Sequence, residues 1–141
     1  MSRIDLSSLI KEAGDAVIAA DARGKILLWN PAAQRIFGFK EDEAIGQSLN
    51  LIVPERFRER HWTGYQRVMQ TGRTRYGTEV LRVPAVHKDG HPLSIAFTIA
   101  LLHSKEGNLE YAVAIIRDET ARWKEERDLR TRLAELEKRC R

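Results

Sequence analysis

Apolar positions divide the chain into short strands and helices. The run AVIAA at residues 16–20 and the run KILLW at residues 25–29 are both compact and apolar, and the turn-forming segment DARG separates them. Two apolar runs around such a turn predict an antiparallel pair of strands. Residues 93–101 (LSIAFTIAL) alternate large apolar side chains with small or polar ones. This period of two predicts a third strand that turns one face toward a core.

Two more strands are expected on either side of the third one. Residues 77–87 are rich in valine and threonine and end at the turn segment KDG. Residues 109–117 (LEYAVAIIR) follow the turn segment KEGN at residues 105–108. The second half of the chain is therefore predicted to form three consecutive strands joined by hairpins.

A helical period predicts one helix before the first strand and a longer one in the middle of the chain. The first is an amphipathic helix within residues 1–14. Its apolar positions are Ile4, Leu6, Leu9 and Ile10. The second spans residues 54–70, begins with a proline and a glutamate that suit a first helical turn, and ends at a Thr-Gly pair. Residues 31–37 and 40–44 predict two short helices between these elements.

Residues 121–141 predict a coiled-coil-like helix at the C-terminal end. Its apolar positions step by four, three and four residues, as the a and d positions of a heptad do. They are Leu129, Leu133, Leu136 and Cys140. Because Arg122 and Glu126 occupy the preceding seam positions, only about two heptads are apolar, and such a helix is marginal alone. It can pair with its twin in a dimer, or it can pack as a single helix on its own domain.

Length and composition predict one folded domain plus an extension. Hydrophobic residues make up 43% and charged residues 31% of the 141 positions, which is typical of a globular protein. No apolar run approaches the roughly 18 residues that a membrane-spanning helix needs, and the first residues lack the apolar block of a secretory signal. The single cysteine, Cys140, cannot form an internal disulfide, so we expect a cytoplasmic location.

The charge pattern does not indicate a nucleic-acid-binding protein. The net charge is +4, but basic residues alternate with acids, as in WKEERDLRTRLAELEKR, which solvates a helix face instead of forming a phosphate-binding stripe. The sequence also lacks a Gly-rich nucleotide loop, a Gly-x-Ser-x-Gly elbow and a recognisable carboxylate pair. We therefore expect neither a nucleic-acid nor a membrane partner, and no enzymatic activity.

The segment ILLWNPAAQRIFGFKEDEAIG at residues 26–46 leads from a strand through Trp-Asn-Pro into a short helix that ends at Gly38. This segment, and the order of elements over residues 15–120, resemble a PAS domain. The resemblance implies an α+β fold, in which a five-stranded antiparallel sheet carries helices on one face. It also implies a sensory module of a bacterial-type signalling protein, acting on an effector domain or a protein partner.

The end of the domain carries a second point of resemblance. Asp118 and Thr120, in the segment RDET, resemble the Asp-x-Thr junction through which PAS domains continue into a signalling helix. The resemblance implies that these two residues relay a signal. An aspartate or threonine at this position can equally serve as a simple helix cap, and the sequence leaves both interpretations open.

His61 is the residue best suited to carry chemistry. On the helix of residues 54–70, Phe57, His61, Gly64, Tyr65 and Val68 step by three or four residues, so we expect them to share a face that looks into a pocket between helix and sheet. A histidine on that face is either a hydrogen-bonded core residue or a ligand. Gly64 costs the helix roughly 1 kcal/mol relative to alanine, and its missing side chain would let a flat group approach the backbone.

The segment RERHWTGYQRVMQTGRTRYGTEVLRVPAVHKDG at residues 58–90 resembles the helix and strand of haem-binding PAS sensors. In that family a histidine on this helix is the proximal iron ligand, and counting back from the Asp-Gly pair places it at His61. The resemblance implies haem b that senses a diatomic gas or a redox state. Where oxygen-sensing members carry arginine or methionine, this chain has Leu81 and Glu79, so bound O₂ would find no donor and CO or NO would be favoured. Arg82 is expected on the opposite face of the strand.

Two alternatives remain open. In the first, the domain holds no ligand and forms a homodimer through its terminal helices and sheet, with Phe97, Ile99 and Ile115 filling the space that would otherwise surround a cofactor. In the second, the pocket takes a small organic acid, drawn by Arg75, Arg82 or His61.

We expect structural roles for the other three histidines and for Trp29 and Trp62. His87, His91 and His103 adjoin turns, so they are expected to be exposed and too scattered for a zinc site. Trp29 is expected in the core, whereas Trp62, away from the face of His61, is expected to contact a second copy of the chain.

Overall fold

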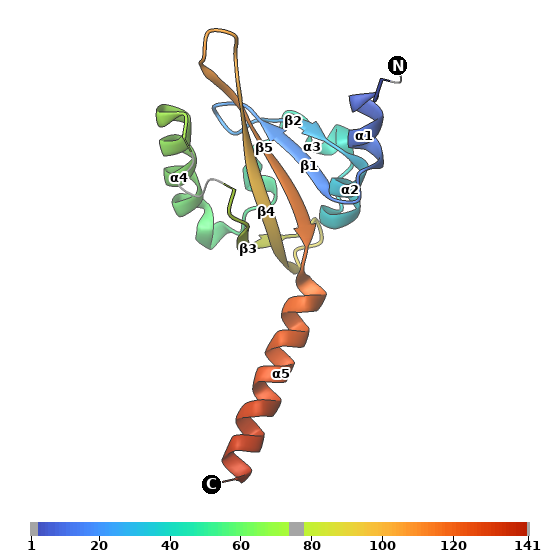
Figure 1. Cartoon of the computed structure of the whole chain (residues 1–141), viewed down its shortest axis with the longest axis vertical. Helices are drawn as coiled ribbons and strands as arrows, with labels where there is room; N and C mark the ends of the chain where they lie inside the picture. Colours follow the sequence, from blue (N-terminus) through green and yellow to red (C-terminus); the bar gives the residue numbers. More distant parts are fainter. Residues whose placement is uncertain (1–2, 74–77, 141) are drawn as a thin grey trace.

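The computed structural model describes residues 3–73 and 78–140, which form an α+β fold around one antiparallel sheet (Figure 1). The predicted five-stranded sheet is confirmed, and its strand order is β2-β1-β5-β4-β3. The strands are β1 (Ala16–Ala20), β2 (Ile26–Trp29), β3 (Leu81–Val86), β4 (Pro92–His103) and β5 (Leu109–Asp118). The first strand therefore lies between β2 and the last strand, and the two halves of the chain form one sheet.

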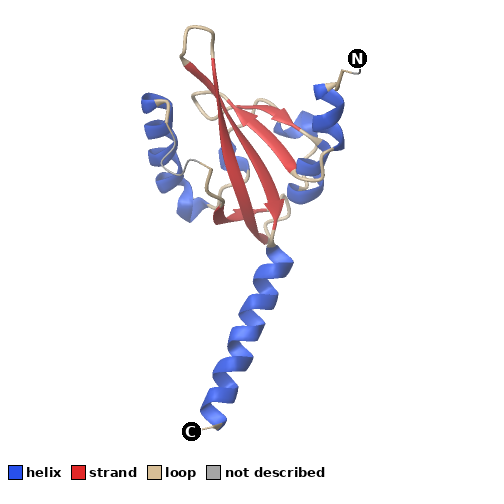
Figure 2. Cartoon of the chain, in the orientation of Figure 1, coloured by secondary structure: helices blue, strands red, loops and turns tan. Residues whose placement is uncertain are grey.

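Helices surround the sheet without covering it evenly (Figure 2). The α-helices are α1 (Leu6–Glu12), α2 (Pro31–Phe37), α3 (Glu41–Ala44), α4 (Arg58–Thr71) and α5 (Thr120–Arg139). Two short 3₁₀ helices, η1 (Leu49–Leu51) and η2 (Glu55–Phe57), connect α3 to α4. In the view of Figure 1, α4 lies to the left of the strands and α1 and α2 lie to the right, while α5 runs away from the domain.

Asn30 connects three elements at the start of α2. As the N-cap residue, its Oδ1 accepts the backbone N–H of Ala33 at 3.1 Å and that of Val17 at 2.9 Å. Its Nδ2 donates to the carbonyl oxygens of Ile10 at 2.9 Å and Asp15 at 3.1 Å. The side chain is buried with all four of these bonds made, which is how a polar group is tolerated in an interior.

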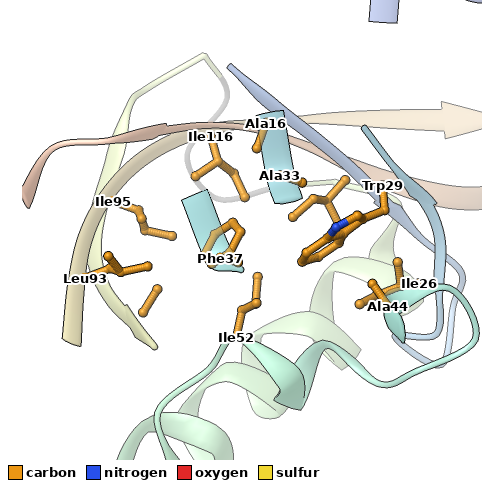
Figure 3. Packing of buried hydrophobic residues seen from close by; sticks show 12 residues of the cluster. Ala16, Ile26, Trp29, Ala33, Phe37, Ala44, Ile52, Leu93, Ile95 and Ile116 are labelled. Atoms are coloured by element: carbon orange, nitrogen blue, oxygen red, sulfur yellow. The ribbon is translucent and has the colours of Figure 1, made fainter. Parts of the chain in front are cut away.

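The core occupies one half of the inner face of the sheet, the face that carries α2 and α3 (Figure 3). Its largest fully buried side chains are Trp29, Phe37, Ile18 and Ile26. Trp29 packs against Phe37 with ring centroids 5.8 Å apart, and its Nε1 donates to the carbonyl of Phe39 at 2.9 Å. The expected core position of Trp29 is confirmed, and burial of such aromatic groups supplies much of the stabilising energy of a domain this size.

Several element boundaries differ from the prediction. The long middle helix begins as the 3₁₀ turn η2, so α4 itself begins only at Arg58. The strand expected from residue 77 begins at Leu81, where β3 pairs with Phe97 of β4; Gly77 lies outside the described residues. Beyond Phe97, β4 pairs only with β5, because β3 begins at Leu81, the partner of Phe97.

α5 exposes the predicted apolar seam. Leu129, Leu133 and Leu136 all remain exposed on this helix, which extends away from the domain (Figure 1). Exposed apolar side chains on one helix face are typical of a surface that pairs with another helix.

Within residues 3–73 and 78–140, none of the helices combines the length and the apolar character that crossing a lipid bilayer would require.

Candidate functional site

Two aromatic side chains hold α4 on the β1–β2 hairpin. Trp62 Nε1 donates to Asn50 Oδ1 at 2.7 Å, and the Tyr65 hydroxyl donates to the carbonyl of Asp21 at 2.6 Å. The Trp62 ring also lies against Gly24, where an added Cβ would come within 2.1 Å of it. Trp62 is thus held within its own domain, and its expected contact with a second copy of the chain stays a prediction.

Burial and the nearby Asp21 raise the pKa of Tyr65 well above its ordinary value of 10.0. The phenol therefore stays protonated at any physiological pH and remains a donor to the Asp21 carbonyl. This hydrogen bond ties α4 to the β1–β2 hairpin one turn after His61.

His61 lies half-buried beside these anchors. Its ring contacts Trp62 edge-on at 4.7 Å between centroids and lies 5.8 Å from the ring of Tyr65. Its Nδ1 is buried and has no hydrogen-bond partner among the described residues. Burial lowers the pKa of His61 below its ordinary 6.5, so the imidazole is neutral at pH 7. A neutral ring with an unsatisfied buried nitrogen is able to ligate a metal or to bond a ligand.

The inner face of the sheet is only partly covered next to the core cluster, against which Phe97 packs. The register aligns Leu81 with Phe97 and Phe97 with Ile116, so these residues lie on the same face. Ile116 is buried, whereas Leu81, Phe97 and Ile99 are half-buried. Apolar side chains that remain half-covered on an inner face suit contact with an apolar ligand.

The expected face of α4 is only partly reproduced. His61, Tyr65 and Val68 are half-buried, but Gly64 is exposed, and a Cβ added to it would meet no atom within 4 Å. At 100° per residue, Gly64 lies about 60° around the helix from His61, at the margin of the stripe. The open space beside Gly64 leaves room for a group to approach, and its proposed role stays a prediction.

Ile115 is a correction to the predicted pocket. It pairs with Thr98 and with Val17, on the face of the sheet opposite to Phe97 and Ile99, and it is 43% exposed. Since successive side chains of a strand alternate between faces, the register places Ile116 on the inner face in its stead. The prediction of Ile115 as a pocket residue is wrong by one position.

The residues around Leu81 lie partly as expected. Arg82 pairs with Ala96 on the outer face and is exposed, as predicted, and Leu81 lies on the inner face. Glu79 precedes β3 and is exposed, so strand alternation does not orient it as expected. Arg75 lies outside the described residues.

The junction at the end of β5 ties α5 to the sheet. Asp118 Oδ1 accepts the backbone N–H of Thr120 at 2.9 Å, and Thr120 Oγ1 accepts the N–H of Ser94 in β4 at 3.0 Å. The N–H of Glu119 donates to the Ser94 carbonyl at 2.8 Å. The N-cap residue of α5 is Glu119, so Asp118 bonds the first N–H of the helix from one position before the cap, and Thr120 links the helix to β4. The relay role of these two residues stays a prediction.

Two shallow grooves lie elsewhere on the molecule. One is between η2 and the β3–β4 hairpin, and the other separates α1 from the outer face of β1 and β5. His61 lines neither of them. Neither groove includes Leu81, Phe97 or Ile99 of the inner face.

Sequence reasoning missed one side-chain cluster. His87, Asp89 and His91 meet at the turn between β3 and β4, with the two imidazole rings stacked at 4.4 Å. The predicted exposure is confirmed for His91 and wrong for His87, which is half-buried. The prediction that these histidines are too scattered for a metal site is wrong for the pair. His103 is exposed, as expected. The available signal was the pattern His-Lys-Asp-Gly-His across a three-residue turn.

Comparison with known proteins agrees with this architecture. A family profile described as the PAS fold matches residues 4–118. The sensor protein FixL of Bradyrhizobium diazoefficiens is 33% identical over 132 residues, which is 94% of this chain and 25% of that protein. The oxygen sensor protein DosP of Escherichia coli is 27% identical over 94 residues, which is 67% of this chain and 12% of that protein. The chain thus spans a quarter or less of these curated relatives.

A solved structure shows the same fold. The PAS domain of a protein from Colwellia psychrerythraea superposes with a TM-score of 0.72, covering 82% of this chain and 95% of that one at 22% identity. At this identity the likeness concerns the arrangement of elements alone.

Proposed function

Since the chain belongs to the PAS family, we propose that it is a sensory module that binds haem b through His61 and passes the state of that site to its terminal helices. The observation that carries the proposal is the buried Nδ1 of His61, which has no partner among the described residues, on a ring that burial keeps neutral. Similarity to a protein named as an oxygen sensor supports the same function class.

The residues present suit a flat, apolar group. Leu81, Phe97 and Ile99 would contact its faces and exclude water, while Tyr65 and Val68 lie beside His61 on α4. Bound haem iron with one histidine ligand supplies a site for a diatomic gas or a change of redox state. Because Leu81 offers no hydrogen-bond donor, the chain favours CO or NO over O₂.

The chain's own contribution is to orient His61. Its ring is confined between Trp62 and Tyr65, whose polar atoms are bonded to Asn50 and to the Asp21 carbonyl. Orientation of a histidine ligand by its surroundings is a general feature of metal sites.

Signal transfer would leave the domain through β5. Asp118 and Thr120 join the last strand to α5, so strain in the sheet would change the first turn of that helix. We propose an effector domain or a protein partner as the receiver and no catalysis by this domain itself. The greater length of the curated relatives supports such an arrangement.

Reconstitution with haem tests the proposal. The wild-type chain, incubated with haem b and freed of excess, is expected to show a sharp Soret band that shifts when CO is added. His61→Ala is expected to lose this band, and His103→Ala, which alters an exposed histidine, is the matched control and keeps it. A wild-type chain without the band would end the haem proposal, and a band unchanged in His61→Ala would remove His61 from its role.

A second candidate is a dimerisation module without a cofactor. The outer face of the sheet exposes Tyr111, Ile115 and Leu102, and α1 exposes Leu6 and Leu9. Together with the seam of α5, these apolar groups favour a homodimer through the sheet and the terminal helices. Dimerisation is compatible with haem binding. If the Soret band is absent, dimerisation or the binding of a small organic acid remains as the candidate function.

A further inference from the structure

The sequence His-Lys-Asp-Gly-His forms a tight hairpin whose ends are the two histidines. The N–H of His87 donates to the carbonyl of His91 at 3.0 Å, and the N–H of Gly90 donates back to the His87 carbonyl at 2.9 Å. Gly90 has a φ of +93°, a conformation that glycine adopts without strain. Residues that close a hairpin as a pair project their side chains to the same side, which explains the stacked imidazole rings.

Asp89 directs its carboxylate back toward both rings. Its Oδ1 accepts the N–H of His91 at 2.9 Å and lies 3.2 Å from Nδ1 of His87. The same oxygen is in close contact with Nδ1 of His91. One ligand atom from each of the three residues thus lies within 4.8 Å of the others. Two ligands of a tetrahedral ion with bonds of about 2.0–2.1 Å lie about 3.3 Å apart, close to the His87–Asp89 separation.

The hairpin is held in place by the first half of the chain. Lys88 donates its backbone N–H to the carbonyl of Phe37 at 2.8 Å, and its Nζ contacts Glu43 at 2.6 Å. The His87 ring lies against Gly38, where an added Cβ would come within 2.5 Å of it. Three independent contacts therefore fix the hairpin on the end of α2 and on α3, so much of the cost of ordering the ligands is already met in the folded chain.

We propose that His87, Asp89 and His91 form a binding site for one divalent ion of the zinc class. Two imidazoles and one carboxylate are a donor set that such ions prefer, and three protein ligands leave a fourth position for water or another donor. The side chains of Asp89 and His91 are 62% and 50% exposed, which gives an ion access from solvent. The positive charge of Lys88 is paired with Glu43 and does not oppose the ion.

Ion binding would use nitrogen lone pairs that hydrogen bonds occupy in the free hairpin. Nδ1 of His87 accepts the N–H of Asp89 at 3.1 Å, a bond that coordination through this nitrogen would replace. An ion bound by these three residues links His87 and His91, at the ends of the turn, to Asp89 within it. Because Lys88 of the same turn contacts α2 and α3, the ion also stabilises the packing of the hairpin on those helices. None of the residues proposed to contact haem takes part, so the two proposals stand or fall separately.

Calorimetric titration of the untagged, haem-free chain with zinc chloride tests the site. We expect one ion per chain for the wild type, and a thermal midpoint that rises with zinc concentration because the ion binds the folded state. His91→Ala and Asp89→Asn are each expected to weaken binding by about tenfold or more, since loss of even an outer-shell partner costs that much. Asp89→Asn keeps an oxygen for the His91 N–H and so preserves the turn.

Matched variants make the result specific. His103→Ala removes a histidine near the other hairpin, and His61→Ala removes the proposed haem ligand; both are expected to bind zinc as the wild type does. Circular dichroism without metal checks that His91→Ala is folded. Absence of binding by the wild type in a large excess of zinc would overturn the proposal, as would equal affinities of the wild type and His91→Ala.

Cobalt provides a second measurement on the same variants. Co²⁺ bound by the wild type is expected to give visible absorption bands of the intensity typical of four-coordinate sites, and His91→Ala is expected to lose them. Bands of equal intensity in both proteins would place the ion elsewhere and contradict the assignment.

Discussion

At the scale of single residues, the fold depends on polar atoms that are buried with their partners. The side chain of Asn30 makes one hydrogen bond each to α1, β1 and α2 and a fourth to the Asp15 carbonyl, and the residue is 3% exposed. Nδ1 of His61, in contrast, is buried without a partner among the described residues. A satisfied buried amide stabilises the native state, and an unsatisfied nitrogen costs stability until a ligand completes it. The same physical rule explains the structural role of Asn30 and supports the proposed role of His61 in binding.

Replacing Asn30 tests its structural role. Asn30→Ala removes the side-chain cap of α2 and four hydrogen bonds of a buried amide, so we expect a loss of about 3 kcal/mol in the free energy of unfolding. Urea unfolding followed by circular dichroism measures it. Asn108→Ala, at an exposed position of the β4–β5 hairpin, is the control and should change stability little. A similar small change in both variants would contradict the role of Asn30.

At the scale of elements, the β3–β4 hairpin and α3 are joined by one carboxylate. Glu43 Oε1 accepts the backbone N–H of Lys40 at 3.0 Å, and Oε2 contacts Lys88 Nζ at 2.6 Å. The hydrogen bond from Lys88 is the largest cause of a lowered pKa for the Glu43 carboxyl, followed by that from the Lys40 backbone. The contact connects elements that are far apart in the sequence.

This lowered pKa has a defined consequence for stability. A carboxyl with a lower pKa in the folded state contributes stability above its ordinary pKa of 4.5 and loses it as the pH falls through the folded value. We expect Glu43→Gln, which keeps an acceptor for Lys40, to unfold at a lower temperature than the wild type at pH 7. The difference should shrink as the pH is lowered below 4.5, as thermal unfolding at a series of pH values would show.

Glu41→Gln is the control for this measurement, because it removes a charge from the same short helix and leaves the Glu43–Lys88 pair intact. A difference between Glu43→Gln and wild type that stays constant across the pH series would show that the charge of Glu43 is not the cause.

At the scale of the whole molecule, apolar surface is concentrated on α1, on the outer face of the sheet and along α5. The exposed leucines of α5 follow a heptad spacing, and a helix with so few buried contacts gains most of its stability from a partner. This distribution favours two chains associating side by side, with their α5 helices paired.

A charge in the seam of α5 tests this arrangement. Leu133→Lys places like charges opposite each other in a paired coil, so we expect a shift from dimer toward monomer in light scattering over a range of protein concentrations. Thr131→Lys puts the same charge on the opposite side of the helix and should leave the association unchanged. A monomeric wild type at high concentration, or equal effects of both variants, would exclude pairing through the seam.

Local patterns determined the elements of this protein and their order. The alternation in residues 93–101, the Asn-Pro start of α2 and the heptad spacing of α5 each depend on neighbours within a few residues, so they are readable without a fold. His61 could also be recognised as a candidate ligand from the sequence, because the helical period predicts its helix and places Tyr65 on the same face. The resemblance of the chain to PAS domains predicted how these elements combine into one sheet with helices.

Only the tertiary structure decided which groups face one another. Pairing of Phe97 with Ile116 put Ile115 on the outer face, because a shift of one residue in register exchanges the faces of a strand. Likewise, the tertiary structure places Trp62 against Asn50 and Gly24, and the turn at Asp89 brings two histidines into contact. Contacts between residues that are distant in the sequence depend on strand register and turn geometry. Sequence periodicity predicts only which face of each element turns inward.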